Sequence, residues 1–584
     1  MKTLLNKKLT IGLAAVLLCF ASVKAQIPDR LKNYQPFKLR EAILSSLNKP
    51  HVHILNDMRC SKNAPCLKAQ TTSGGTGDDF GYTMIPTRDG GFAIVGGTNS
   101  GDGDFKVPSS NGSDAYLAIY NGHRQLEWTN TIGGTGEDNF SGVAQTSDGG
   151  YIAVGQSEST DGKILGNHGG FDVLLAKFSA SGNVEWQKSF GGSGDEFGEA
   201  VVPNFYGGYA IVAFTTSDDG NVSGNHNTDG NFDGWFIQVG AKGNLLFQHC
   251  YGGSDFDGFF GMVPSNNASF ILEGASGSID GDVSGNHGNG DAWIVKVNAL
   301  GKIVWQKCVG GSGGEGDGNN DITTTTDGNV VIDGGSNSTD GDINAQNDTA
   351  VSFAAKLNSS TGNIIWSKSY AEPSLRNGGG IFATSDGGAV ECGAVAPSFD
   401  ATTFDVLISK FDKNGNEEWY KRLGGSDFDG AITGYELPNH DLNIVCLTKS
   451  ADGDVKNNHG GVDEWIIELG RCGNDLNNDN TSSENAIAVA KNNTTLLSNY
   501  PNPVSNSTTI SFSVPQSQKV SIQIFDMNGR LIKTLADAQM QAGVHQLVWN
   551  VKDEKGNAVN KGIHFLKMQT GNYTEMKKLA LVTQ

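Results

Sequence analysis

A unit of about 58 residues recurs along most of this chain. A double glycine opens the copies at Gly74, Gly133, Gly191, Gly252, Gly310 and Gly424, and the intervals between these positions are 59, 58, 61, 58 and 114 residues. Because the last interval equals two units of 57, a degenerate sixth copy is expected near Ala371–Lys421. Self-similarity at a fixed period is typical of repeat architectures. The repeat therefore limits the possible folds more than any other feature of the sequence.

Each copy has the pattern of four short strands. The first strand follows the double glycine, as in Phe140–Thr146, and a tight turn such as Asp148-Gly149-Gly150 leads into the second. The third strands are predicted at Asp172–Phe178, Gly234–Val239, Ala292–Val297 and Glu464–Leu469. The fourth strands carry an aromatic residue five positions before the next unit, at Trp128, Trp186, Phe247, Trp305, Trp366 and Trp419. Short alternating segments of this kind predict antiparallel hairpins, and four-stranded sheets repeated radially form a β-propeller, so the predicted fold class is all-β.

The two ends of the repeated region are complementary. The seventh unit opens at Gly424 and stops near Gly470, after its third strand. Leu67–Gln70 precede Gly74 as a fourth strand would, with Ala69 at the Trp position. We therefore expect the N-terminal strand to complete the last sheet, which would remove two exposed strand edges. This predicts a seven-bladed propeller over residues 66–472.

Three of the eight cysteines lie at this closure. Cys60 and Cys66 flank the first strand, and Cys472 follows the last one. A Cys66–Cys472 or Cys60–Cys472 disulfide would join the two ends and add roughly 2–4 kcal/mol in an oxidising compartment, and Cys60–Cys66 is the rival pairing. Cys250 and Cys308 hold the same position in adjacent units and are expected to lie too far apart to bond.

The chain is acidic, and its first residues are expected to form an export signal. Its net charge of −21 at pH 7 repels nucleic acid and anionic lipid and attracts cations. Three lysines precede the apolar run Ile11–Phe20, and Val23-Lys24-Ala25 follows it, which is the order of a secretory signal peptide over residues 1–25. No other apolar run approaches membrane length, so the mature chain is predicted to be exported without a transmembrane segment. Residues 26–65 form an N-terminal extension, in which Phe37–Leu47 has helical spacing.

The repeat resembles a known family. The pattern GGSGD, then DGG-Y-I, STDGD, D-x-W-x-x-K and W-x-K is similar to the seven-bladed β-propeller repeat of secreted bacterial proteins, the SBBP type, over about 400 residues. The resemblance implies the propeller fold, and the family is not tied to any one activity. The sixth unit departs from the pattern, because it lacks the acidic Gly-Gly loop and the Asp-Gly-Asp sequence.

A second resemblance covers the C-terminal end. Residues 473–495 are rich in Asn, Asp, Ser and Thr and are interpreted as a linker. Residues 496–584, with Asn499–Pro503 near their start and Lys577–Val582 near their end, resemble the type A C-terminal sorting domain of the type IX secretion system. The resemblance implies a small β-sandwich that serves as an export address, with the type IX machinery as partner and the mature protein either released or attached to the outer cell surface. The alternation Val520-Ile522-Ile524 independently predicts a small all-β domain.

Strand topology places the loops of each unit. The double-glycine loop and the loop between the second and third strands lie at one edge of each sheet, and the two short turns lie at the other edge. Binding residues gather on long loops held by a rigid scaffold. The edge with the long acidic loops, here called the Gly-Gly face, is therefore the predicted working face.

The loops between the second and third strands carry Asp-Gly sequences. Alternating carboxylates around a glycine suit Ca²⁺, which takes six to eight oxygen ligands. The alternative is a tight turn that uses Asp and Gly for their backbone geometry. Two exposed carboxylates about 6 Å apart in water repel by only ~0.7 kcal/mol, so these sequences do not require a metal ion. The candidate calcium ligands are Asp102, Asp104, Asp161, Asp219, Asp280, Asp282, Asp340, Asp342, Asp452 and Asp454.

Two further residue series recur. Asn-His pairs place His168, His226, His287 and His459 in the same loops, and a ring of equivalent positions is too wide to form one zinc site, so a loop-stabilising role is the simpler interpretation. The aromatic residue of the fourth strand is interpreted as packing between sheets rather than as a cofactor or sugar platform.

Two hypotheses for function remain. The sequence contains no nucleophile elbow, no HExxH motif and no phosphate-binding glycine loop before a helix. The first hypothesis is a secreted or surface-displayed propeller that binds a glycan or a protein. The second is an extracellular polysaccharide-acting enzyme whose site lies at the acidic face of the propeller channel, where the sixth unit and the Glu315–Asp321 loop break the repeat.

Overall fold

The structure is a computed structural model that describes residues 61, 64–107, 112–226, 230–315, 322–336, 338–343, 351–370, 376–395, 403–472, 495–500, 504, 507–514, 516–527, 529–541, 543–571 and 573–581. The predicted signal peptide, most of the N-terminal extension, Cys60 and nearly all of the predicted linker lie outside these residues. The chain divides into two compact units, Met1–Cys472 and Gly473–Gln584.

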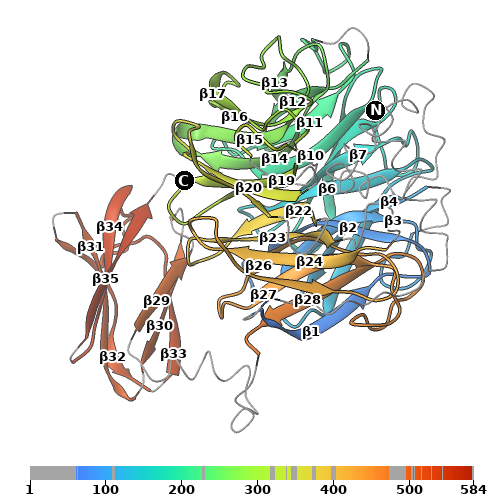
Figure 1. Cartoon of the computed structure of the whole chain (residues 1–584). Helices are drawn as coiled ribbons and strands as arrows, with labels where there is room; N and C mark the ends of the chain where they lie inside the picture. The colour runs from blue at the N-terminus through green and yellow to red at the C-terminus, as the bar shows by residue number, and fades with distance from the viewer. Residues whose placement is uncertain are drawn as a thin grey trace. The chain divides into compact units, whose positions relative to one another are not determined.

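Seven four-stranded antiparallel sheets make up the described part of the first unit (Figure 1). Sheet I contains β2 (Asp79–Pro86), β3 (Phe92–Thr98), β4 (Asp114–Tyr120) and β5 (Leu126–Ile132). Sheet II contains β6 (Asp138–Gln145), β7 (Tyr151–Ser157), β8 (Asp172–Phe178) and β9 (Val184–Phe190). Sheet III contains β10 (Glu196–Pro203), β11 (Tyr209–Thr215), β12 (Asp233–Val239) and β13 (Leu245–Tyr251). Sheet IV contains β14 (Asp257–Ser265), β15 (Ser269–Ser276), β16 (Asp291–Val297) and β17 (Ile303–Val309), with the short 3-10 helix η1 (Asn266–Ala268) between its first two strands.

The remaining three sheets follow the same order. Sheet V contains β18 (Ile322–Thr324), β19 (Val330–Ser336), β20 (Val351–Leu357) and β21 (Ile364–Tyr370). Sheet VI contains β22 (Arg376–Ala383), β23 (Ala389–Val395), β24 (Asp405–Phe411) and β25 (Glu417–Leu423). Sheet VII contains β26 (Asp429–Glu436), β27 (Leu442–Thr448), β28 (Asp463–Gly470) and β1 (Cys66–Ser73). The predicted third strand at Asp172–Phe178 is confirmed residue for residue, whereas β6 begins two residues before the predicted Phe140 because Asp138 already pairs with Ser157.

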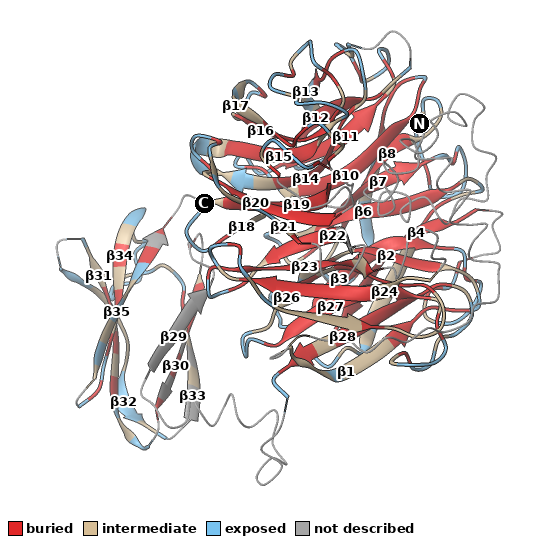
Figure 2. Ribbon diagram, viewed as in Figure 1, coloured by how far each residue is buried: buried red, intermediate tan, exposed pale blue. Residues whose placement is uncertain are grey.

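Consecutive sheets pack face to face. The first strand of each sheet contacts the first strand of the next, and β2 of sheet I also contacts β26 of sheet VII. The second and third strands are buried along their whole length in most sheets, while the fourth strands are only half-buried (Figure 2). Apolar side chains on neighbouring sheets therefore form the core, as in the cluster that joins Val95 and Leu117 of sheet I to Leu174 of sheet II. This all-β arrangement is consistent with a β-propeller.

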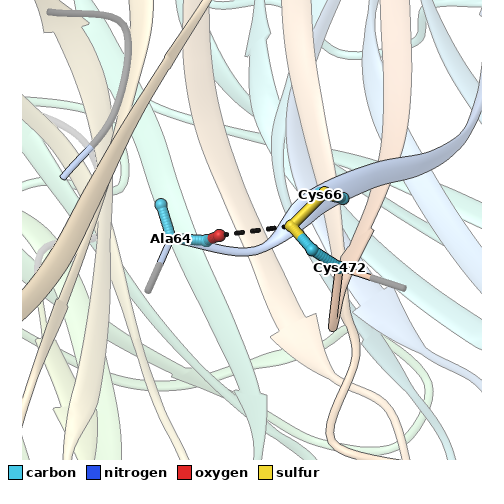
Figure 3. Close-up of a disulfide and its surroundings, with 3 residues drawn as sticks. All are labelled: Ala64, Cys66 and Cys472. Carbon is cyan, nitrogen blue, oxygen red and sulfur yellow. Dashed lines mark hydrogen bonds between the residues drawn. A yellow bond between two sulfur atoms is a disulfide. The ribbon is translucent and has the colours of Figure 1, made fainter. Parts of the chain in front are cut away.

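The N-terminal strand completes the last sheet, as the sequence predicts. β1 pairs antiparallel with β28, with Thr72 opposite Trp465. Ala69 lies opposite Glu468 beside a register shift, which is the place that Trp186 takes opposite Lys177 in sheet II. Cys66 forms a disulfide with Cys472 across 406 residues of chain, and the carbonyl oxygen of Ala64 lies 3.6 Å from Cys472 Sγ (Figure 3). Of the pairings left open by the sequence, the structure selects Cys66–Cys472, while Cys250 and Cys308 are free and buried.

The second unit is also all-β. A three-stranded sheet contains β29 (Thr495–Tyr500), β30 (Thr508–Val514) and β33 (Gly543–Trp549), and a four-stranded sheet contains β31 (Gln518–Asp526), β32 (Leu531–Met540), β34 (Gly562–Gln569) and β35 (Thr574–Leu581). The predicted alternation is confirmed, since Val520, Ile522 and Ile524 are fully buried in one core with Trp549.

Candidate functional site: the Gly-Gly face

Hydrogen bonds tie the Asp-Gly loop to the double-glycine loop of the same sheet. In sheet II, Asp161 Oδ1 accepts a hydrogen bond from the backbone N–H of Thr135 at 2.8 Å. The backbone N–H of Lys163 donates in return to the carbonyl oxygen of Gly133 at 3.0 Å. The same carboxylate contact recurs at Asp102, Asp219, Asp280, Asp340 and Asp452. These contacts confirm that the two long loops of a sheet lie together.

The glycine of the Asp-Gly sequence is required by this close approach. Gly162 has a φ of +66°, which favours glycine, and a Cβ at this position would lie 2.7 Å from the Cα of Gly134. The Asp-Gly sequence therefore works as a turn that fastens one loop onto another.

The second carboxylates of the Asp-Gly-Asp sequences make different contacts. Asp104 and Asp454 accept hydrogen bonds from the backbone N–H groups of Gly74 and Gly424 at 3.3 and 3.2 Å. Asp282 Oδ2 lies 3.6 Å from His226 Nε2, and Asp342 Oδ2 lies 2.8 Å from Lys307 Nζ. Among the residues that the structure describes, no group of three or more His, Cys, Asp and Glu side chains is arranged to hold a metal ion. Calcium binding by these loops stays a prediction.

A buried carboxylate, which the sequence analysis missed, is the first residue of the first strand in five sheets, and in sheet V it lies at an isolated bridge before β18. Asp257 Oδ2 accepts hydrogen bonds from the N–H of Gly253 and the hydroxyl of Ser278, both at 2.7 Å, and its Oδ1 accepts one from Ser276. The equivalent residues are Asp79, Asp138, Glu196, Glu315 and Asp429. The signal was an acidic residue five positions after each double glycine together with a Ser/Thr-x-Ser sequence at the end of the second strand.

Burial shifts the acidity of these groups. It raises the pKa of Asp138, Glu196 and Asp429 to about 7 and that of Asp257 to about 6, because the charged form loses its hydration. Glu315 takes this repeated position, with hydrogen bonds from Gly311 and Ser336 at 2.8 Å. Residues 316–321 lie outside the described residues.

Four histidines stand on the same face. His287 Nδ1 lies 2.5 Å from Oδ2 of Asp291, the first residue of its third strand, and the side chain remains 37% exposed. The same pairing joins His168 to Asp172, His226 to Asp233 and His459 to Asp463. Each ring is thus held by its Nδ1 atom, in agreement with the predicted loop-stabilising role.

Glu464 and Glu199 are two of the buried acids that lie outside these repeated positions. Glu464 accepts hydrogen bonds from the hydroxyls of Tyr116 and Tyr120 across the contact between sheets VII and I, and burial raises its pKa to about 8. Glu199 stands at the register shift of β10, is 7% exposed, and has a pKa raised to about 8 by burial.

The opposite edge of the sheets has a packing role. The turn glycine between the third and fourth strands lies against the fourth-strand aromatic ring of the preceding sheet, as Gly182 does against Trp128 and Gly243 against Trp186. This supports the interpretation of the aromatic series as packing between sheets.

Comparisons with known proteins identify the C-terminal region. Residues 498–582 match the family model described as "Secretion system C-terminal sorting domain". No curated protein sequence matches the chain. The match supports export through the type IX secretion system and indicates secretion to the cell surface or the extracellular space. Among the described residues, no helix is long and apolar enough to cross a membrane.

Similar solved structures include three distant proteins. PorZ, a surface component of the type IX secretion system of Porphyromonas gingivalis, is 12% identical with a TM-score of 0.25, over 87% of this chain and 74% of that chain. A gluconolactonase from Xanthomonas campestris is 9% identical with a TM-score of 0.30, over 67% and 99% of the two chains. An acylaminoacyl peptidase from Pyrococcus horikoshii is 10% identical with a TM-score of 0.36, over 75% and 59%. Such low scores carry no argument about what this chain does.

Proposed function

We propose that the first unit is a closed, seven-bladed β-propeller of the SBBP-type repeat and that the second unit is a small β-sandwich. The contact of β2 with β26, the pairing of β1 with β28 and the Cys66–Cys472 disulfide support closure of the propeller. The two sheets around one apolar core support the sandwich.

We further propose that the protein is a secreted or surface-displayed binding module for a glycan or a surface protein. The observation that carries this proposal is the set of similarly held, partly exposed imidazoles, with 35–40% of each side chain exposed, on sheets II, III, IV and VII. Equivalent polar groups on several sheets suit a ligand made of repeated units. Several weak contacts made to one ligand at the same time raise the overall affinity. The sorting domain delivers this face to the cell exterior, where such ligands occur.

A glycan array and a binding assay with whole cells test this proposal. The wild-type protein is expected to bind one class of ligand, and His226→Ala together with His287→Ala should weaken that binding about tenfold or more. His440→Ala is the matched control, because His440 is an exposed histidine in a turn at the opposite edge of sheet VII. Binding that is unaffected by the paired substitutions, or no binding to any glycan or cell surface, would contradict the proposal.

Calcium binding by the Asp-Gly loops is a separate proposal. The acidity of the chain and the alternating carboxylates support it, and Asp282 Oδ2 is buried and accepts no hydrogen bond. Millimolar calcium should raise the melting temperature, and Asp282→Asn together with Asp342→Asn should reduce that rise. No rise in the wild-type protein would reject calcium.

The enzyme hypothesis is favoured by one observation, which is Glu199. Its raised pKa of about 8 keeps this acid protonated at neutral pH, as a general acid requires. If the propeller cleaves a polysaccharide, Glu199→Gln should abolish the release of reducing ends without loss of binding. Release by the wild-type protein that persists in the variant would remove Glu199 from this role.

A further inference from the structure

Buried carboxylates from adjacent sheets face each other at the Gly-Gly face. The first residue of a third strand, such as Asp233 of β12, lies beside the acid that opens the next sheet, here Asp257 of β14. A Cβ built on Gly252 between them would lie 2.6 Å from Asp233 Oδ1 and 2.7 Å from Asp257 Oδ2, so the two oxygens flank the same point. Both side chains are 0% exposed.

The available hydrogen-bond donors satisfy only part of each pair. Asp257 accepts three hydrogen bonds, from Gly253, Ser276 and Ser278. Asp233 Oδ2 is contacted by the backbone N–H and the Nδ1 of His226 at 2.8 and 2.7 Å. Asp233 Oδ1 is buried and has no donor, although it is the oxygen that faces Asp257.

The same arrangement occurs at four contacts between sheets. A donorless, fully buried Oδ1 faces the acid of the next sheet in the pairs Asp172–Glu196, Asp233–Asp257, Asp291–Glu315 and Asp463–Asp79. The third-strand residue of each pair also holds the histidine described above. At the Asp405–Asp429 contact, Arg422 Nε lies 2.5 Å from Asp405 and supplies a positive charge instead.

Two ionised carboxylates that are buried side by side need a further group to offset their charge. Removing a carboxylate from water costs several kcal/mol, and a second negative charge beside it adds to that cost. A carboxyl proton on one oxygen removes a charge and supplies the missing donor at once. The aspartic-protease dyad is the general precedent for two close carboxyl groups that share one proton.

We propose that each of these four carboxyl pairs binds one proton at neutral pH, carried between the donorless Oδ1 and the facing oxygen of the next sheet. The pairs thus form a set of proton-binding sites that links the Gly-Gly face to pH. This inference does not depend on which ligand the face binds.

Neighbouring charges differ between the pairs. His168, Asp195 and Cys250 lie beside Asp172 and Glu196, and the third loop position there is the uncharged Asn221. His226 and Asp282 face Asp233, His287 and Asp342 face Asp291, and His459 and Asp78 face the Asp463–Asp79 pair.

A proton bound by each pair makes the folded protein less stable as the pH rises. Burial raises the pKa of Glu196 to about 7 and those of Asp257 and Asp463 to about 6, above the values near 4 of the unfolded chain. The folded state then binds more protons than the unfolded state between these values. The stabilisation is complete below about pH 4 and is lost as the pH rises through about 6 to 7.

Asparagine at the third-strand position tests the proton directly. The amide of Asp172→Asn supplies a donor to Glu196 without a titrating proton, and its oxygen still accepts from His168. In the triple variant Asp172→Asn, Asp233→Asn, Asp291→Asn, the fall in melting temperature between about pH 5.5 and about pH 8 should shrink to roughly half of the wild-type fall. Potentiometric titration of the folded proteins should show about three fewer protons released over the same range, whatever the change in stability.

Two controls distinguish a shared proton from a general loss of negative charge and from a bound metal ion. Asp218→Asn removes one exposed charge from the same loop region and should leave the proton release in this range unchanged. Wild-type proton release in the triple variant would overturn the proposal. It would also be overturned if EDTA lowers the wild-type melting temperature at about pH 8 and calcium restores it only when the aspartates are present, because a metal ion would then occupy the pairs.

Discussion

A single glycine sets how closely two neighbouring sheets approach at their outer strands. Gly182 has a φ of +81°, and a Cβ there would lie 2.8 Å from the Trp128 ring. Gly207 has nearly the same backbone conformation, with a φ of +83°, but a Cβ there would meet no atom within 4 Å. Alanine at either position strains the backbone, but only at Gly182 does the added methyl group also meet another side chain. Comparing the two substitutions therefore distinguishes the cost of backbone strain from the cost of disturbed packing.

Gly207→Ala should cost about 1 kcal/mol, which is the strain of a left-handed alanine. Gly182→Ala should cost about 2–4 kcal/mol, because the added methyl group also displaces the indole ring. Urea unfolding of both variants measures the difference. Equal costs would show that the contact between Gly182 and Trp128 does not hold the sheets together.

Glu464 makes the stability of the chain depend on pH at the contact between sheets VII and I. Burial raises its pKa to about 8, above the value near 4 of the unfolded chain, so the folded state retains a proton that the unfolded state loses. Its stabilising contribution is complete below about pH 4 and is lost as the pH rises to about 8, by about 1 kcal/mol per pH unit. Glu464→Gln keeps a partner for Tyr116 and Tyr120 and should remove this slope in urea unfolding between pH values of about 5 and 8.

Glu127→Gln serves as the control, since Glu127 is exposed on β5 and should leave the slope unchanged. An unchanged slope in Glu464→Gln would mean that this acid is ionised in the folded protein.

At this scale the sequence predicts residue roles that repeat locally. The aromatic series and the histidine loops follow from spacing alone, because their packing partners recur with the same period. The carboxyl pairs cannot be predicted from spacing, since Asp172 and Glu196 come together only when two sheets pack against each other. The role of Glu315 is hidden in the sequence for the same reason, because it depends on the hydroxyl of Ser336 at the end of β19 and on that of Ser338 beyond it.

The element that completes sheet VII is β1. Cys66 links it to Cys472 over a separation of 406 residues, so the disulfide restricts a very long loop of the unfolded chain. Replacing both cysteines with serine should destabilise the protein by about 2–4 kcal/mol. Hydrogen exchange of the backbone amides of β1 should also become faster than that of β28, because β1 is the outer strand of its sheet.

Reduction of the wild-type protein is the internal control. Dithiothreitol should give the wild-type protein the stability of the double variant and should leave the variant itself unchanged. Equal stability of the oxidised wild-type protein and the variant would show that the disulfide does not hold β1 in place.

Strand identity is the part of the fold that the sequence predicts best. The third strand at Asp172–Phe178 and the role of Leu67–Gln70 as a missing fourth strand both follow from the period and are confirmed. Strand ends are less predictable, since β6 begins at Asp138 through a hydrogen-bonding pair that apolar alternation does not reveal. The choice among three cysteine pairings also needed the structure, because Cys60 and Cys66 both precede Leu67–Gln70 in the sequence.

At the scale of the whole molecule, the C-terminal unit determines where the protein goes. Deletion of residues 498–582 should abolish its appearance at the cell surface and in the medium, because these residues match a secretion sorting domain. Immunoblotting of cell fractions measures this, and a carrier protein fused to residues 496–584 should be exported in turn. Unchanged export of the truncated chain would mean that the sorting signal lies elsewhere.

The central claim is that seven four-stranded sheets close into one propeller through the pairing of β1 with β28. A crystal or cryo-electron microscopy structure of the mature protein tests it most directly. The account predicts seven sheets around one axis, with Thr72 opposite Trp465 and Cys66 bonded to Cys472. A different number of sheets, or a strand at Cys66–Ser73 that pairs elsewhere, would contradict it.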